Sequence, residues 1–330
     1  MEKLLITGGC GFIGSNLIRY TSRTGPSIRV LDDLSNVSPV WAFDERGTWR
    51  AQESWQDVEL VIGDVRDKET VERAVRGVDA VVHLAARASV LQSLQSPGET
   101  FDVNVNGTLN VLEACRKQGA GGLVFVSSNA AVGDQPCPVD EETLPRPLSA
   151  YGASKLSAEA LCFAYFSSFG LPTLSLRLAN CYGPFAERTS NVISLFTRAA
   201  MEKKPLVIRG DGGQTRDFVH VDDVCSAIHS AVSLISGKPS GLDATSHRPG
   251  NRAPACLGEV IQIGSGVETS INELARLISS AVGGDACLIH GPYQAGEIRR
   301  NVSRIEKARE ALGFTPQVSL AEGIRALVSP

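Results

Sequence analysis

The sequence predicts an α/β fold with a parallel, doubly wound sheet at its centre. Short apolar runs alternate with amphipathic segments through the first half of the chain, and the runs carry few charges, as strands buried on both faces do. A glycine-rich turn separates the first run from the first amphipathic segment. Helical crossovers keep such strands parallel and cover both faces of the sheet. In chain order, we expect strands near residues 3–7, 28–32, 58–62, 79–83 and 121–127 and helices near residues 12–22, 67–76, 99–118 and 149–169.

The first expected strand and helix are joined by a glycine turn within KLLITGGCGFIGSNL, residues 3–17. Gly8 allows a sharp bend, Gly11 lets the backbone approach a pyrophosphate, and Gly14 lets the helix pack closely on the strand. The free N–H groups and the dipole at the start of the helix favour phosphate oxygens there. A tight turn without a ligand is the alternative, but the residues that follow favour dinucleotide binding.

The second expected strand ends in Asp32, about 20 residues after the glycine turn. An acidic side chain at this offset accepts hydrogen bonds from the hydroxyls of an adenosine ribose. Because a carboxylate repels a ribose 2′-phosphate, the sequence predicts NAD rather than NADP as the cofactor.

Composition and charge favour a small-molecule partner. The 330 residues are 43% hydrophobic, enough for a large core, and the net charge is −4. No long basic or acidic run indicates binding to nucleic acid or to a membrane surface, and no apolar run is long enough to span a bilayer.

Cysteine and histidine usage gives no pattern of metal ligands. The eight cysteines are widely spaced without a Cys-x-x-Cys pair, and the five histidines are scattered. This spacing predicts reduced thiols and no metal site. No signal-peptide pattern precedes the first strand, so we expect a cytoplasmic protein.

Small and polar residues follow three of the expected strands, at the edge where open parallel sheets bind ligands. Asp64–Val65 follow the third strand and are expected to hold the adenine, while Ala85–Ala86 follow the fourth and let the cofactor pass close to the backbone. Ser127–Ser128 end the fifth. His83 is expected to be a buried structural histidine rather than a catalytic one.

The segment Ser149–Lys155 begins a long expected helix and carries the candidate chemistry. A spacing of four places Tyr151 and Lys155 on one helix face, one turn apart. A phenol titrates near pKa ~10 in water, and a nearby ammonium together with a positively charged nicotinamide ring stabilises the phenolate. Tyr151 is therefore the expected base, and a shared solvated helix face is the alternative.

Two segments interrupt the alternation. Residues 36–57 hold all the tryptophans, Trp41, Trp49 and Trp55, and we expect a small self-packed flap there; a loop that covers a site or a subunit contact is the alternative. Residues 237–257 are rich in Pro, Gly, Ser and Arg and are predicted to form a flexible insertion without an assignable role.

A set of motifs spreads over nearly the whole chain: TGGCGFIG (7–14), LDDLSN (31–36), GDVRD (63–67), HLAA (83–86), NVNGT (104–108), YGASK (151–155), RLANCYGP (177–184), GDGGQTRDFVHVDDV (210–224), IGSG (263–266) and GEIR (296–299). Together they resemble the extended short-chain dehydrogenase/reductases. Within that superfamily the chain is similar to the nucleotide-sugar epimerases, particularly UDP-hexose 4-epimerases.

The resemblance implies an architecture of two domains. An NAD-binding Rossmann domain would comprise residues 1–178 and 218–264, and a smaller nucleotide-sugar-binding domain would comprise residues 179–217 and 265–330. It also implies a homodimer in which the helices at 99–118 and 149–169 pair across the two copies.

The resemblance also implies the site residues, carried over by position. The implied catalytic residues are Ser128, Tyr151 and Lys155. The implied cofactor contacts are Gly8, Gly11, Phe12, Ile13, Gly14, Asp32, Asn36, Asp64, Val65, Leu84, Ala85, Asn104 and Lys155. The implied substrate contacts are Ser128, Asn129, Asn180, Asn191, Arg216, Arg299 and Asn301. Two arginines on one pyrophosphate would make charge-assisted, fork-like hydrogen bonds.

Several positions depart from the patterns of relatives. Val132 stands where many relatives have tyrosine, which removes a hydroxyl near the sugar, and Phe185 stands where uronic-acid epimerases often carry arginine. Asn301 is intermediate between the bulky residue of enzymes restricted to plain hexoses and the small residue of those that accept N-acetyl sugars. Similar dehydratases carry Asp-Glu after the hydroxyl residue of the serine loop, where this chain has Asn129 and Ala130.

We therefore expect an NAD-dependent nucleotide-sugar 4-epimerase that acts on a UDP-hexose or UDP-N-acetylhexosamine through a transient 4-keto sugar. The alternatives are a reductase or dehydratase of the same superfamily and a UDP-uronate 4-epimerase. A non-catalytic dinucleotide sensor would lack the tyrosine and lysine, so Tyr151 and Lys155 argue against it.

Overall fold

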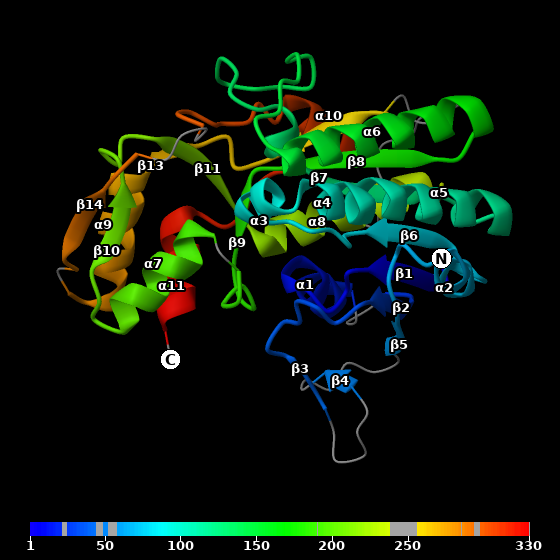
Figure 1. Cartoon of the computed structure of the whole chain (residues 1–330), viewed down its shortest axis with the longest axis horizontal. Coiled ribbons are helices and arrows are strands. Elements are labelled where there is room, and N and C mark those ends of the chain that lie inside the picture. Colours follow the sequence, from blue (N-terminus) through cyan, green and yellow to red (C-terminus); the bar gives the residue numbers. More distant parts are fainter. Residues whose placement is uncertain are drawn as a thin grey trace.

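The computed structural model describes residues 1–21, 25–43, 49–51, 58–189, 191–237, 256–284, 286–293 and 298–329 of the chain. It has two lobes, a large one built on the main sheet and a smaller one that holds β10, β14, α7, α9 and α11 (Figure 1). Among the described residues, none of the helices is both long enough and apolar enough to cross a bilayer.

The large lobe is organised around a sheet in which all neighbouring strands are parallel, in the order β12-β8-β7-β6-β1-β2-β5. Its strands are β1 (Lys3–Thr7), β2 (Ser27–Asp32), β5 (Val58–Ile62), β6 (Ala80–His83), β7 (Leu123–Ser128), β8 (Thr173–Leu178) and β12 (Val260–Ile263). The strand order reverses between β1 and β6, and ligands of open α/β sheets bind at such a switch point. The parallel doubly wound sheet predicted from the sequence is thus confirmed.

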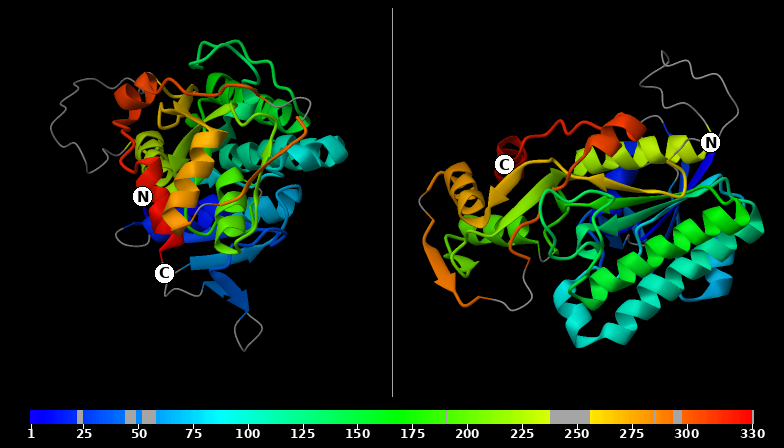
Figure 2. Two further views of the ribbon diagram at one scale, coloured as in Figure 1. Left: turned by 90° about the vertical axis from the view of Figure 1, so that its left-hand side faces the viewer. Right: turned by 90° about the horizontal axis from the view of Figure 1, so that it is seen from above.

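Helices cover both faces of this sheet (Figure 2). Leu4 and Ile6 of β1 belong to a core with α1 (Phe12–Thr21), α8 (Val221–Ile235) and α10 (Glu306–Leu312). Leu5, which points to the opposite face, belongs to a second core with α2 (Lys68–Val75), α5 (Gly107–Gln118) and α6 (Ala150–Phe169). Apolar side chains on both faces explain why the strands read as continuous apolar runs.

The helix expected at 99–118 is present, and it contains a π-helical turn that was not predicted. After the short helices α3 (Val90–Gln95) and α4 (Pro97–Phe101), the π-helical turn at Asp102–Asn106 leads directly into α5, with right-handed helical backbone at the junction residues Asp102 and Asn106. The expected helix is therefore confirmed, and only its uniform α geometry was wrong. Tertiary contacts of Asn104 within the turn, described below, explain why local periodicity missed it, and π turns of this kind are frequent at functional sites.

The segment at 36–57 is not a flap packed only on itself. It contains the antiparallel strands β3 (Trp41–Phe43) and β4 (Trp49–Ala51), and the Trp41 side chain is buried in the core of the large lobe. The Trp41 indole donates a hydrogen bond to Ser15 Oγ on α1 at 3.1 Å. Trp55 and nearly all of the insertion at 237–257 lie outside the described residues.

The small lobe has its own core and smaller sheets. Strands β9 (Asn180–Tyr182), β11 (Thr215–His220) and β13 (Glu268–Ser270) form one sheet, and β10 (Leu206–Arg209) pairs with β14 (Leu288–Gly291). Helices α7 (Val192–Met201), α9 (Ile271–Val282) and α11 (Leu320–Val328) pack against them. The domain boundary expected after residue 217 falls inside β11, so this strand continues from one proposed domain into the other.

Candidate active site

The glycine turn after β1 forms a cradle that side chains would fill. Gly8 has a φ of +70°, and a Cβ added there would lie 2.7 Å from the Ala85 nitrogen. A Cβ at Gly14 would lie 2.5 Å from the Gly8 carbonyl oxygen. The backbone therefore approaches the loop after β6 closely and leaves the N-terminus of α1 open, which is the arrangement that a pyrophosphate requires.

Asp32, at the end of β2, holds this cradle in place. Its carboxylate is buried and accepts hydrogen bonds from the Cys10 nitrogen at 2.9 Å and from the Leu34 nitrogen at 2.8 Å. Burial raises the pKa of Asp32, while the two backbone donors oppose that rise. A carboxylate has more acceptor sites than these two bonds use, so the predicted contact with a ribose fits this geometry.

The other predicted cofactor residues lie along the same edge of the sheet. Phe12 and Ile13 begin α1, Asn36 is exposed after β2, and Leu84 and Ala85 follow β6. Thr7, at the end of β1, is opposite Leu31 in β2 and His83 in β6, which brings the ends of the three strands together.

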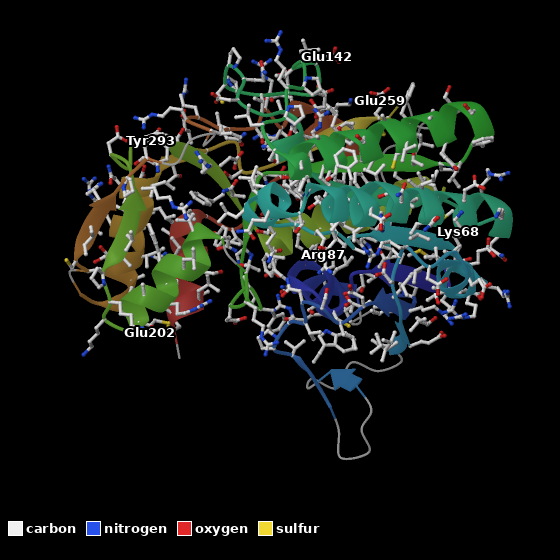
Figure 3. All side chains as sticks on the ribbon, in the orientation of Figure 1. Lys68, Arg87, Glu142, Glu202, Glu259 and Tyr293 are labelled. Atoms are coloured by element: carbon white, nitrogen blue, oxygen red, sulfur yellow. The ribbon has the colours of Figure 1, made fainter. Side chains whose placement is uncertain are left out.

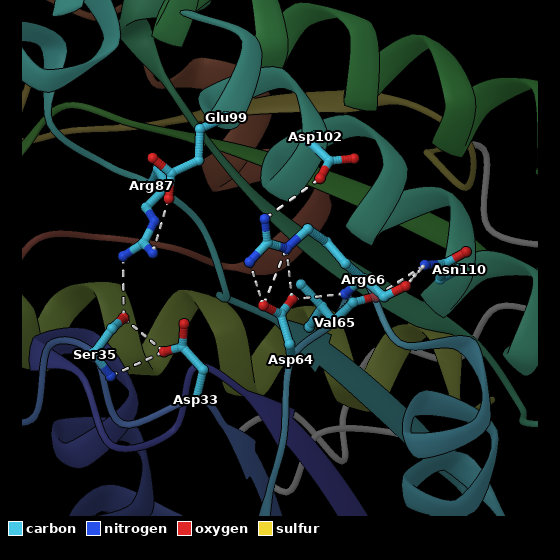
Figure 4. A network of polar contacts seen from close by, with 9 residues as sticks. All are labelled: Asp33, Ser35, Asp64, Val65, Arg66, Arg87, Glu99, Asp102 and Asn110. Carbon is cyan, nitrogen blue, oxygen red and sulfur yellow. Dashed lines mark hydrogen bonds and ion pairs between the residues drawn. The ribbon is translucent and has the colours of Figure 1, made fainter. Parts of the chain in front are cut away.

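Asp64 and Val65, which follow β5, are more occupied by protein contacts than the sequence suggested. The Asp64 carboxylate is paired with Arg66 at 2.6 Å, and this pairing holds its pKa below the usual range (Figure 4). The Val65 side chain is buried in the second core, against Gly107. A contact of either residue with adenine stays a prediction.

Asn104 is buried, and the bonds its amide makes are to protein groups. Its Oδ1 accepts from the Arg87 nitrogen at 2.8 Å, and its Nδ2 donates to the Arg87 carbonyl at 3.3 Å and to Ser154 Oγ at 2.9 Å. These bonds link the π turn, the loop after β6 and α6. Asn104 thus holds in place the loop after β6, which borders the glycine turn.

The candidate catalytic residues meet where the end of β7 contacts the first turns of α6. Ser149 caps α6 by accepting a hydrogen bond from the Gly152 nitrogen at 3.1 Å. Tyr151 is buried, and its phenol is hydrogen-bonded to the Ser128 side chain. Burial raises the pKa of Tyr151, and the bond with Ser128 opposes that rise.

Lys155 lies one turn further along α6. Its Nζ donates to the Val126 carbonyl at 2.8 Å and lies 4.7 Å from the centroid of the Phe125 ring. Burial lowers the pKa of Lys155 to about 8, against the opposing charge of Glu159. We expected Lys155 to lower the pKa of the phenol; instead, burial is the largest influence on Tyr151, because the ammonium is directed to the backbone of β7.

A buried ion pair beside this group was not anticipated from the sequence. Arg177 on β8 donates to both carboxylate oxygens of Glu159 on α6, with Nη2 to Oε2 at 2.7 Å. The same carboxylate accepts a hydrogen bond from Ser127 at 2.5 Å. Glu159 follows Lys155 by four residues on the same helix face. This spacing was the sequence signal that could have shown that Glu159 lies beside the candidate catalytic residues.

His83 is a structural histidine, as the sequence predicted. Its ring is fully buried and hydrogen-bonds to Thr7 Oγ1 at 2.6 Å and to Thr108 Oγ1 at 3.0 Å. Burial, together with the charge of Lys155, lowers the pKa of His83 to about 3. The imidazole is therefore neutral near pH 7 and cannot act there as an imidazolium acid.

The serine loop after β7 is tied to the C-terminal part of the chain. Asn129 Nδ2 donates to Asn301 Oδ1 at 3.0 Å and to Ser303 Oγ at 2.9 Å, and all of these side chains are buried. The Ser303 nitrogen in turn donates to the Asp217 carboxylate at 3.1 Å. These bonds fix two predicted substrate residues, Asn129 and Asn301, against each other.

Arg216 and Arg299 belong to adjacent backbone segments, since the Thr215 nitrogen donates to the Arg299 carbonyl at 3.0 Å. Arg216 Nη1 donates to the Thr215 carbonyl. The Arg299 guanidinium is paired with Asp211 at 2.8 Å and bonded to the hydroxyl of Tyr293, which lies near β14 (Figure 3). To bind a diphosphate, the Arg299 guanidinium would have to divide its N–H donors between the phosphate oxygens and these two partners.

The remaining predicted substrate residues, Asn180 and Asn191, lie on different elements. Asn180 begins β9, whose first residue pairs with Phe218 in β11. Asn191 caps α7, and its Oδ1 accepts a hydrogen bond from the Ser194 nitrogen at 2.7 Å. Helix capping explains the presence of Asn191 without a ligand, so its contact with a substrate stays a prediction.

The chain is similar to known proteins over nearly its whole length. The model of the NAD dependent epimerase/dehydratase family matches residues 4–242. The UDP-glucose 4-epimerase of Mycolicibacterium smegmatis is 34% identical over 99% of this chain and 97% of its own length. The dTDP-glucose 4,6-dehydratase of Streptomyces niveus is 31% identical over 98% of this chain and 90% of its own length. The structure of Thermus thermophilus UDP-glucose 4-epimerase in complex with NAD superposes with a TM-score of 0.81 at 32% identity, over 99% of this chain and 97% of that one.

Proposed function

The chain belongs to the NAD-dependent epimerase/dehydratase family, and on that premise we propose that it is a nucleotide-sugar 4-epimerase acting on a UDP-linked hexose or N-acetylhexosamine. It is an enzyme whose cofactor is NAD. The observation that carries the proposal is the cluster of half-buried Ser128 with buried Tyr151 and Lys155, next to two residues of the serine loop, Asn129 and Ala130, that cannot exchange a proton at neutral pH.

In this mechanism Tyr151 takes the proton of the sugar 4-hydroxyl and later returns it. Ser128, already bonded to the phenol, hydrogen-bonds the reacting oxygen. Bound NAD would supply the acceptor for a hydride from C4, which balances the proton taken by Tyr151, and a positive charge beside the phenol. Because burial raises the pKa of Tyr151, the protein alone does not favour the phenolate, and that charge is needed to make Tyr151 a base near pH 7.

The protein also has to hold the sugar nucleotide while the 4-keto sugar turns over. We assign this role to Asn180, Arg216 and Arg299, whose backbone segments lie together at one end of the small lobe. Arginine suits a diphosphate because its planar fork donates two parallel hydrogen bonds to phosphate oxygens. A sugar held through its diphosphate can rotate without leaving the site.

A dehydratase is the principal alternative, and it differs in what happens after C4 is oxidised. Elimination across C5 and C6 needs an acid and a base beside the sugar. The Asn129 side-chain amide does not ionise, so it cannot act as an acid or a base, and its hydrogen bonds to Asn301 and Ser303 hold it in place. This supports return of hydrogen to C4 rather than loss of water.

The test is a reaction in heavy water with a panel of UDP-glucose, UDP-N-acetylglucosamine and UDP-glucuronate, without added NAD. We expect a C4-inverted sugar with no deuterium bound to carbon. Deuterium at C6 with loss of water would establish a dehydratase, and turnover only with added NAD would favour a reductase. Preference for UDP-glucuronate would overturn the choice of neutral sugars, for which the presence of Phe185 argues.

We also propose that two copies associate through α5 and α6 and that the enzyme acts in the cytoplasm. Leu109 on α5 and Phe163 and Phe169 on α6 are large apolar side chains, yet they are 37%, 53% and 55% exposed. Pairing these helices across two copies would bury them. Sedimentation should give a dimer that Phe163→Asp dissociates and Val267→Asp, a change at an exposed position outside these helices, leaves intact.

A further inference from the structure

Arg87 connects two loops at the switch point of the main sheet, where a ligand crevice is expected. It lies in the loop after β6, and its Nη1 donates to Ser35 Oγ, in the loop after β2, at 3.1 Å (Figure 4). In the sheet, β1 lies between β6 and β2. The side chain therefore spans the end of β1, where the glycine turn begins.

The position of Arg87 is fixed from behind by buried groups. Asn104 bonds both the nitrogen and the carbonyl of Arg87, at 2.8 and 3.3 Å, and Asn104 is itself bonded to Ser154 on α6. The π-helical turn at Asp102–Asn106 carries Asn104 to this place. The backbone at Arg87 is therefore held in a defined position.

The hydrogen bonds made by the Arg87 guanidinium are more exposed than the bonds between Asn104 and the Arg87 backbone. Nη2 donates to Glu99 on α4 at 3.1 Å, and Ser35 is also bonded to Asp33. About two of the five N–H donors of the guanidinium are used by described residues, so the others are free to bind a ligand.

The charges near Arg87 indicate which kind of ligand its guanidinium can bind. Asp32, Asp33, Asp64 and Glu99 are acidic, and the charge of Arg87 contributes to the low pKa of Asp64. The glycine turn offers a pyrophosphate backbone N–H groups and a helix dipole but no full positive charge. A dinucleotide pyrophosphate carries two negative charges, which a guanidinium neutralises best through charge-assisted bonds.

We propose that Arg87 is a further cofactor-binding residue, which bonds the pyrophosphate of NAD from the side opposite the glycine turn and, through Ser35, bridges the crevice over it. The inference rests on the use of NAD and not on the identity of the sugar. As a consequence, NAD would dissociate more slowly. NAD must stay bound while the sugar is first oxidised and then reduced, and a second contact with its pyrophosphate helps to keep it bound.

The test measures ligand binding without turnover. Calorimetry with ADP and with adenosine, on the full chain freed of nucleotide, compares the parent with Arg87→Gln. We expect Arg87→Gln to weaken ADP by at least about tenfold and adenosine by less than about twofold, because a charged hydrogen bond is lost only with the phosphates. Dissociation of NAD, followed after dilution, should quicken by a similar factor.

Arg66→Gln is the matched control. Arg66 lies in the same acidic cluster and pairs with Asp64 and Asp102, on the far side from the glycine turn in the strand order. Because its partner Asp64 is a predicted adenine contact, the control is read as the ratio of the affinities for ADP and adenosine, which Arg66→Gln should leave within about twofold of the parent. Unchanged ADP binding in Arg87→Gln, equal losses for ADP and adenosine, or an equal effect of Arg66→Gln would each overturn the proposal. Circular dichroism and the melting temperature establish that each variant is folded, and Arg87→Lys should recover part of the affinity for ADP.

Discussion

Replacing Glu159 by glutamine would remove one charge from the buried ion pair behind the catalytic group while nearly keeping the shape of the side chain. The side chains of Arg177 and Glu159 are only 5% and 3% exposed. Arg177 Nη1 has no hydrogen-bond partner among the described residues, so the guanidinium depends on Glu159. Removing one partner of such a pair leaves an uncompensated buried charge, and we expect a loss of about 3–5 kcal/mol in the free energy of unfolding.

The same change should alter catalysis through Lys155. Glu159 is the principal influence that raises the pKa of Lys155 against burial, and the balance of the two gives about 8. Without the carboxylate this pKa falls further, so the ammonium loses its proton at a lower pH. The alkaline limb of the pH profile of turnover should therefore move to lower pH in Glu159→Gln.

Urea unfolding and the pH profile test the two effects separately. The double variant Glu159→Leu, Arg177→Met removes both charges and should recover most of the stability, because apolar residues can replace a buried pair at little cost. If Glu159→Gln unfolds within about 1 kcal/mol of the parent and its alkaline limb does not move, the pair neither stabilises the fold nor influences Lys155, and the reasoning is refuted.

Three further predictions concern the remaining parts of the site. Tyr151→Phe should bind NAD normally in a titration but lose turnover by about 10²–10⁴-fold, and parental turnover would mean that another group is the base. Arg216→Ala should weaken the sugar nucleotide far more than NAD in calorimetry, whereas equal losses would indicate damage to the fold. His83 binds its proton more tightly in the unfolded chain than in the folded protein, where its pKa is about 3, so stability should fall by up to about 1.4 kcal/mol per pH unit below pH 6.5. His83→Gln should lessen that slope in urea titrations, and an unchanged slope would contradict the assignment.

Local sequence pattern determined most of the main sheet. Buried parallel strands must be apolar on both faces, so β1, β2 and β5 were visible as short runs with few charges, and Gly8 and Gly14 marked a turn through which a helix could follow closely. The i, i+4 spacing of Tyr151 and Lys155 likewise placed them on one face of α6.

Tertiary contacts decided what that pattern could not. The π turn exists where Asn104 bonds the backbone of Arg87, and Trp41 is buried because it packs in the core of the large lobe, where Ser15 on α1 accepts its indole hydrogen. Nothing in the residues next to Asn104 or Trp41 encodes these partners. Backbone periodicity therefore predicted the long helix without its π turn, and it predicted a self-contained flap, which was wrong.

The pKa shifts of the site residues also could not be predicted without the tertiary structure. From the sequence alone, Lys155 was expected to lower the pKa of Tyr151, since only their spacing was known. The folded chain buries the phenol and directs the ammonium to the Val126 carbonyl, 2.8 Å away. The sequence by itself thus predicted which residues would carry the chemistry, and the tertiary structure determined the surroundings that shift their pKa values, because burial and distance depend on segments that meet only when the chain folds.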